Sequence, residues 1–164
     1  MRVRKLAERY NYKPNRLAVN LKSGKTRTIG IILPSILNNF FTTVLCGIEK
    51  VTNERNYNII TCISNESFEK EVTNTEILSN GIIDGLIVAI AEETQIKKDF
   101  KHFEACIKEG HPVVMFDRIT SEIECDKVVV DDLNDAYLAT SHLIGMYCKK
   151  PALVSAIVLL GVGE

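Results

Sequence analysis

Short apolar segments alternate with amphipathic ones along most of this chain, beginning at residue 28. The apolar segments predict β-strands at residues 28–33, 58–62, 85–89, 112–116 and 127–130. Apolar residues between them recur at helical spacing, which predicts helices over residues 40–55, 67–80 and 97–109. The crossovers are long enough for right-handed βαβ units, so the pattern predicts an α/β fold with a parallel sheet and helices on both faces.

The first predicted strand, residues 28–33, lacks a polar face and therefore suits a position buried on both sides of the sheet. Pro34 ends this strand because it has no N–H to donate. Asn38 or Asn39 can cap the helix that follows. Ligands of open α/β sheets bind beyond the carboxyl ends of the strands, so we expect a site at this turn.

The two ends of the chain depart from this alternation. Residues 1–10 predict one short amphipathic helix, and a second can start with Asn15 as its cap and end at Ser23 and Gly24. Isolated helices of that length are marginal in water, so we expect them to become ordered against another surface. Near the other end, Asp132 can cap a helix over residues 133–147, and the apolar run 152–160 predicts a last buried strand.

Charge divides the chain at about residue 27. Residues 1–27 hold nine basic side chains and one acidic one, a net charge of +8. The whole chain has 20 basic and 21 acidic residues, so the remainder has 11 and 20, a net charge of −9. A basic arm on an acidic body indicates binding to a polyanion, of which nucleic acid is the commonest, although a solvated basic tail would have the same composition.

Other features exclude several classes of protein. No apolar run reaches the roughly 20 residues of a membrane span, and the N-terminus lacks the apolar core of a secretory signal, so we expect a cytoplasmic protein. The three histidines are not spaced as a metal site or beside a nucleophile, and the terminal Gly-Val-Gly lacks the third glycine of a dinucleotide site. We therefore expect neither an enzyme nor a cofactor.

The cysteines are odd in number and contain no C-x-x-C pair, which favours reduced thiols over zinc ligands or disulfides. They are Cys46, Cys62, Cys106, Cys125 and Cys148.

Four segments, in this order, resemble the LacI/GalR family of bacterial transcriptional repressors. The first is continuous from KLAERYNYKPN to RNYNII, and the other three are SNGIIDGLIVA, HPVVMFDR and VVVDDLNDAYLATSHLI. The resemblance implies a helix-turn-helix, a hinge helix and two Rossmann-like subdomains of the type I periplasmic-binding-protein fold, which close on a sugar or similar effector. It divides this chain into a remnant of the DNA-binding headpiece and hinge at 1–27, an N-terminal effector-binding subdomain at 28–131 and the start of a C-terminal subdomain at 132–164.

The resemblance places the hinge helix at residues 17–23, with Leu21 in the position of the leucine that wedges into the minor groove. Minor-groove proteins combine such apolar wedges with basic contacts to the backbone. In the alternative interpretation, Leu17 and Leu21 pack against the body of the protein. The implied DNA-binding residues are Asn15, Arg16, Ala18, Leu21 and Lys22.

The resemblance also implies effector-binding residues at the ends of two strands. Asn38, Phe40 and Phe41 match the family's N-P-F-F turn, with Asn39 in place of the proline, and an amide beside aromatic faces suits a sugar. Asp117 and Arg118 resemble an acceptor–donor pair that grips sugar hydroxyls. The alternatives are that Asn38 only caps a helix, that the phenylalanines fill the core, and that Asp117 and Arg118 form a surface ion pair.

The chain departs from the family pattern at both ends. Met1 begins at the family's third helix, and the sequence after Cys148 lacks the expected glycine-rich turn. We therefore expect a fragment of a LacI-type regulator whose sugar-like effector controls operator binding, and which is a homodimer in its full-length form. The alternatives are a sugar-binding module without DNA contact, which would not need the basic arm, and an inactive gene fragment.

Overall fold

The computed structural model describes residues 6–7, 9–12 and 24–152. Its strands are β1 (Thr28–Leu33), β2 (Asn58–Ile63), β3 (Gly85–Val88), β4 (Val113–Phe116) and β5 (Asp126–Val128). Its helices are α3 (Asn39–Glu54), α4 (Phe68–Ser79), α5 (Glu92–Lys97), α6 (Lys101–Lys108) and α7 (Asp132–Gly145). The five strands predicted between residues 28 and 130 are all present, with ends that differ by at most two residues.

The five strands form one sheet in the order β2-β1-β3-β4-β5, and every neighbouring pair is parallel. Strand β1 lies inside the sheet, where Ile29 is in register with Ile59 on one side and Gly85 on the other. This position explains why its sequence has no polar face. The prediction of a parallel α/β fold is confirmed, and the carboxyl ends of all five strands meet at one edge.

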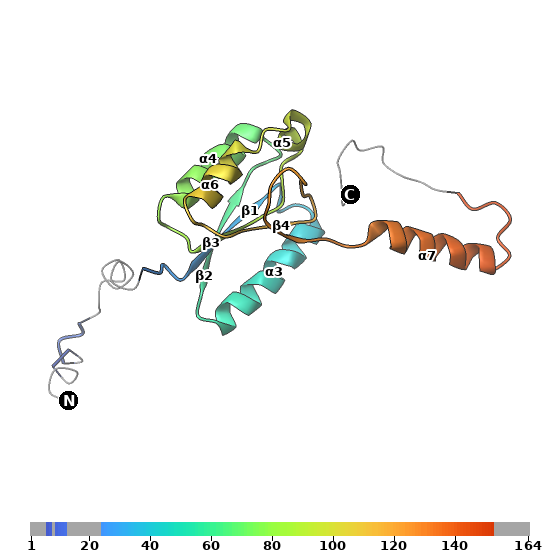
Figure 1. The fold of residues 1–164 in the computed structure, drawn as a ribbon. Helices are drawn as coiled ribbons and strands as arrows, with labels where there is room; N and C mark the ends of the chain where they lie inside the picture. Colours follow the sequence, from blue (N-terminus) through green and yellow to red (C-terminus); the bar gives the residue numbers. More distant parts are fainter. Residues whose placement is uncertain (1–5, 8, 13–23, 153–164) are drawn as a thin grey trace.

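Helices cover both faces of the sheet, as predicted (Figure 1). Helix α3 packs on one face, where Phe41 joins a core cluster with Ile31 and Leu33. Helices α4 and α6 lie on the other face, where Leu78 and Phe103 belong to a cluster that also contains Ile32. Successive residues of β1 thus enter opposite cores, because side chains alternate along a strand.

Asparagine or glycine in the left-handed conformation follows three of the helices. Asn56, Gly81 and Gly110 have φ angles of 58°, 74° and 94°. Asparagine and glycine tolerate this conformation better than other residues, so the predicted helix ends at these positions are confirmed.

The prediction of one helix over residues 97–109 is wrong, because the segment contains the end of α5 and all of α6. Lys98 separates the two helices with a φ of 51°, and its N–H donates to the carbonyl of Thr94 at 2.9 Å. The apolar spacing restarts after the break, since Ile96 is 63% exposed whereas Phe100 and Phe103 are buried. The position of this break was not predicted because lysine is not a typical helix-ending residue.

Helix α7 begins one residue earlier than predicted. Asp131, and not Asp132, is its N-cap and accepts the N–H of Asn134 at 3.0 Å. None of its residues is buried, and the helix projects away from the sheet (Figure 1).

Several predictions concern residues that are not described. The five implied DNA-binding residues Asn15, Arg16, Ala18, Leu21 and Lys22 lie outside the described residues, as does 153–160 of the last predicted strand. Of the predicted N-terminal helix, the described residues Leu6, Ala7 and Arg9 are helical. No helix in the described part of the chain has the length and apolar content needed to cross a membrane.

Candidate functional site

The loops at the carboxyl edge of the sheet are tied to one another by backbone hydrogen bonds. The N–H of Ser64, after β2, donates to the carbonyl of Leu33 at 2.9 Å. The N–H of Ile90, after β3, donates to the carbonyl of Arg118 at 3.3 Å. The first bond joins the exits of β1 and β2, and the second joins the exits of β3 and β4, so the loops of each pair are held next to each other.

The first loop separates the two phenylalanines of the Asn-Asn-Phe-Phe turn. Asn38 caps α3 by accepting the N–H of Phe40 at 2.9 Å, as the capping alternative requires. Phe41 is only 2% exposed and packs edge-to-face on Phe116, with ring centres 6.2 Å apart. Phe40 is 46% exposed. Adjacent helical residues point in different directions, so Phe41 belongs to the core and Phe40 is available to a ligand.

Asp117 and Arg118 leave β4 in different directions. Asp117 has a φ of 59° and lines a groove on the α3 face, together with Phe40. Burial raises the pKa of Asp117, and the neighbouring carboxylate of Asp132 adds to this effect while the Arg118 guanidinium opposes it. Arg118 instead points to the loop after β2, where its Nη1 donates to Oε2 of Glu66 at 2.7 Å.

Glu66 is the residue of this site that the sequence did not reveal. Besides the bond to Arg118, its Oε2 accepts the N–H of Glu92 at 2.8 Å, so it joins the loops after β2, β3 and β4. Its own φ is 61°, a left-handed value that is uncommon for glutamate. The polar turn after the second predicted strand was only a weak indication that Glu66 belongs to the site, because nothing in the order of elements along the chain places β2 and β4 at the same site.

A second buried network lies behind these loops and positions the start of α5. Glu71 of α4 is fully buried, and its Oε2 accepts the N–H of Ala91 at 2.6 Å. Its Oε1 accepts the hydroxyl of Thr94 at 2.6 Å and lies 3.2 Å from Nε2 of His102. His102 is therefore a buried structural residue that joins α6 to α4.

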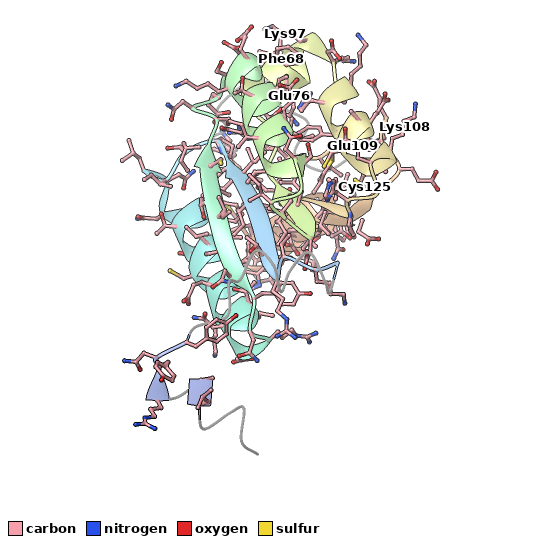
Figure 2. The ribbon with its side chains drawn as sticks, turned by 90° about the vertical axis from the view of Figure 1, so that its left-hand side faces the viewer. Phe68, Glu76, Lys97, Lys108, Glu109 and Cys125 are labelled. Carbon is pink, nitrogen blue, oxygen red and sulfur yellow. The ribbon has the colours of Figure 1, made fainter. Side chains whose placement is uncertain are left out.

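Helices α4 and α5 are also joined at the surface of the protein, where Lys97 lies near Phe68 (Figure 2). The Nζ of Lys97 lies 4.4 Å from the centre of the Phe68 ring and 2.9 Å from Oε1 of Glu69. This contact fixes the end of α5 against the beginning of α4.

The groove on the α3 face has a volume of about 510 Å³ and is mainly apolar. Its walls come from α3, from the face of β3, β4 and β5, and from the segment that follows β5. The lining residues are Phe40, Val44, Ile48, Ile87, Val114, Phe116, Asp117, Val128, Val129, Val130 and Asp132. Such a lining suits packing against another apolar surface, whereas the polar groups that could bind a hydroxylated ligand lie at the carboxyl edge.

Within the described part of the chain, no group of three or more His, Cys, Asp and Glu side chains is arranged to hold a metal ion. The chemistry available at the carboxyl edge is therefore that of an exposed aromatic face, carboxylates and one guanidinium.

Comparison with known proteins identifies related sequences over most of the chain. The family described as "Periplasmic binding proteins and sugar binding domain of LacI family" matches residues 26–161. The HTH-type transcriptional regulator RegA of Clostridium acetobutylicum is 32% identical over 149 residues, which cover 87% of this chain and 42% of RegA. Catabolite control protein A of Priestia megaterium is 33% identical over 148 residues, which cover 90% of this chain and 43% of that protein.

The fold also matches a solved structure with a ligand. The crystal structure of a LacI family transcriptional regulator from Enterococcus faecium with bound ribose has a TM-score of 0.56 and 29% identity. The match covers 73% of this chain and 41% of that one. The chain thus spans about two-fifths of the length of the relatives that it matches.

Proposed function

Because this chain belongs to the family of periplasmic binding proteins and LacI-type sugar-binding domains, we propose that it is the effector-binding part of a cytoplasmic transcriptional regulator. In this proposal a sugar or sugar derivative binds at the carboxyl edge of the sheet and controls attachment to a DNA operator. The observation that carries the proposal is the presence of the Phe40 ring, the Asp117 carboxylate and the Arg118 guanidinium at one edge. An aromatic face with a carboxylate acceptor and a guanidinium donor is suitable chemistry for a sugar.

The roles within the candidate site follow from the surroundings of each side chain. Phe40 would contact the apolar face of the sugar, while Asp117 would accept and Arg118 would donate hydrogen bonds to its hydroxyls. Asn38 and Phe41 would act indirectly, Asn38 by capping α3 and Phe41 by supporting the Phe40 ring, whose centre lies 5.3 Å away.

We also propose the domain division expected from the sequence, with the effector-binding subdomain at residues 28–131 and a second subdomain that starts at 132. This division is supported by α7, which begins at Asp132 and has no buried residue. Residues 1–27 would form the DNA-binding segment, with a net charge of +8 to attract phosphates. As in the sequence-based expectation, the full-length regulator would be a homodimer.

The effector half of the proposal is tested by titrating the chain with ribose and following backbone amide signals by NMR. We expect shifts at Phe40, Asp117 and Arg118. Asp117→Ala should weaken binding at least about tenfold and Phe40→Ala about three- to tenfold, because they remove a charged hydrogen-bond acceptor and an aromatic contact. Glu76→Ala, at an exposed position on α4, is the control and should leave binding unchanged. Absence of shifts at these three residues with any sugar would contradict the proposal.

The DNA half is tested separately by fluorescence anisotropy with a labelled duplex. We expect weak binding that falls steeply between low and moderate salt, since a segment of this charge acts mainly through phosphates. Replacing Arg16 and Lys22 together by alanine should weaken it further. If the chain binds a sugar but has no measurable affinity for DNA at low salt, the sugar-binding module without DNA contact becomes the correct alternative.

A further inference from the structure

We propose that Glu66 sets the charge class of the effector, so that this edge of the sheet accepts an uncharged polyhydroxy ligand and disfavours its phosphate ester. The inference rests on the proposed function, because it assumes that the carboxyl edge is one wall of the effector site. It goes further by stating which kind of sugar this wall can bind and which residue makes the selection.

Arg118 is the only basic residue on the five loops that form this edge. These loops are residues 34–38, 64–67, 89–93, 117–120 and 129–132, and the structure describes all of them. They also hold six carboxylates, from Glu66, Glu92, Glu93, Asp117, Asp131 and Asp132, so their formal net charge is −5. Lys97 offsets part of this charge from outside the loops, at 3.8 Å from the carboxylate of Glu93.

Arg118 is already paired with the carboxylate of Glu66. Its Oε2 lies 2.7 Å from Nη1 of Arg118, and the two side chains are only 34% and 15% exposed. The same oxygen accepts the N–H of Glu92 at 2.8 Å, so the carboxylate is held from two sides. A phosphate on the remaining N–H groups of Arg118 would lie beside the Glu66 carboxylate and be repelled by it, and a phosphate that displaced Glu66 would leave that carboxylate without its ion-pair partner.

A neutral sugar incurs neither cost. A guanidinium has five N–H donors, and the bond to Glu66 uses one of them. One hydroxyl of a sugar can therefore accept from Arg118, and another can donate to Asp117, while the pair with Glu66 stays intact. Sugar hydroxyls can act as donors toward these carboxylates, whereas phosphate oxygens are acceptors and are repelled by them.

The repulsion is large enough to select between the two ligands. Each carboxylate at about 5 Å from a unit negative charge weakens binding about fourfold in a water-like dielectric, and over a hundredfold at an effective dielectric of about 20. A phosphate carries more than one negative charge at neutral pH, so the wall as a whole favours the uncharged ligand.

The test compares ribose with ribose 5-phosphate by NMR titration of the full chain, with methyl ribofuranoside as a second uncharged ligand because the 5-phosphate can form only the furanose ring. We expect ribose to bind at least about fivefold more tightly than its phosphate ester. Glu66→Gln should reduce the preference for ribose over ribose 5-phosphate by about fivefold or more. The substitution removes the charge and frees Arg118, while the amide oxygen can still accept from Glu92. Glu76→Gln is the matched control, since it removes one charge from the outer surface of α4 (Figure 2) and should leave the ratio unchanged.

Three outcomes would overturn the inference. The first is equal or tighter binding of ribose 5-phosphate by the unsubstituted chain, and this comparison decides the matter even if Glu66→Gln fails to fold. The second is an equal change of the ratio in Glu66→Gln and Glu76→Gln, which would show that only total charge matters. The third is the absence of amide shifts with either ligand, even at high millimolar concentration, which would overturn the proposed effector function as well.

Discussion

The most specific stability prediction concerns Glu71, the buried carboxylate that joins α4, α5 and α6. Glu71→Ala removes the acceptor of the Ala91 N–H and the Thr94 hydroxyl, both at 2.6 Å, and the partner of His102. A buried donor without an acceptor costs about 1–3 kcal/mol, and Glu71→Ala leaves at least two such donors. We therefore expect Glu71→Ala to lower the free energy of unfolding by about 3–5 kcal/mol.

This loss is a large part of the stability of a typical domain, which is about 5–15 kcal/mol. With a urea m-value of about 2 kcal/mol/M, the midpoint of unfolding measured by circular dichroism should fall by about 2 M. Glu71→Gln should have an intermediate effect, because its amide has one acceptor oxygen instead of two.

Glu76→Ala is the control on the same helix, with an expected change within about 0.5 kcal/mol because Glu76 is exposed. A loss of less than about 1 kcal/mol in Glu71→Ala would refute the reasoning, since it would mean that the three donors find other partners at little cost.

Two further predictions concern a pair of aromatic rings and one carboxylate. Phe41→Ala should lower the free energy of unfolding by about 3–5 kcal/mol because it empties a core position, whereas Phe40→Ala should lower it by under about 1 kcal/mol. Similar losses for the two variants, measured by urea unfolding, would contradict the assignment of Phe41 to the core. Burial alone would raise the pKa of Asp84, but hydrogen bonds from Thr26 and Arg27 outweigh it and hold the pKa below its usual value. The resulting stabilisation, about 1 kcal/mol, is present above the unfolded-state pKa near 4 and is lost as the pH falls through the folded-state pKa. The difference in melting temperature between the unsubstituted chain and Asp84→Asn should therefore shrink below about pH 4, and a difference that stays constant down to the acid transition would exclude this origin.

The sequence predicted those parts of the fold that depend on local spacing. A β-branched run without a polar face identified β1, and residues suited to the left-handed conformation marked three helix ends. The break at Lys98 was missed because it reflects how α5 and α6 pack separately, which residue preferences do not encode. The cap of α7 was misplaced by one residue because either Asp131 or Asp132 could fill that role.

The candidate site was only partly predictable for a different reason. The resemblance named Phe40, Asp117 and Arg118 from motifs, but it did not distinguish the exposed Phe40 from the buried Phe41. The helical spacing of Phe41 with Val44, Leu45 and Ile48 contained that information, since these residues pack together. The bond between Glu66 and Arg118 joins residues 52 positions apart through the strand order, which a single sequence does not specify.

The adjacent residues Ile90 and Ala91 have a consequence for hydrogen exchange. Both residues are fully buried, but the amide of Ile90 donates to the carbonyl of Arg118 at the candidate site, whereas that of Ala91 donates to Glu71 of α4. Exchange of a buried amide with deuterium requires its hydrogen bond to open, so these neighbours respond to two different opening motions. If an added sugar slowed exchange at Ile90 alone, the loops of the candidate site would have tightened, whereas slower exchange at both amides would indicate tightening of the whole layer formed by α4, α5 and α6.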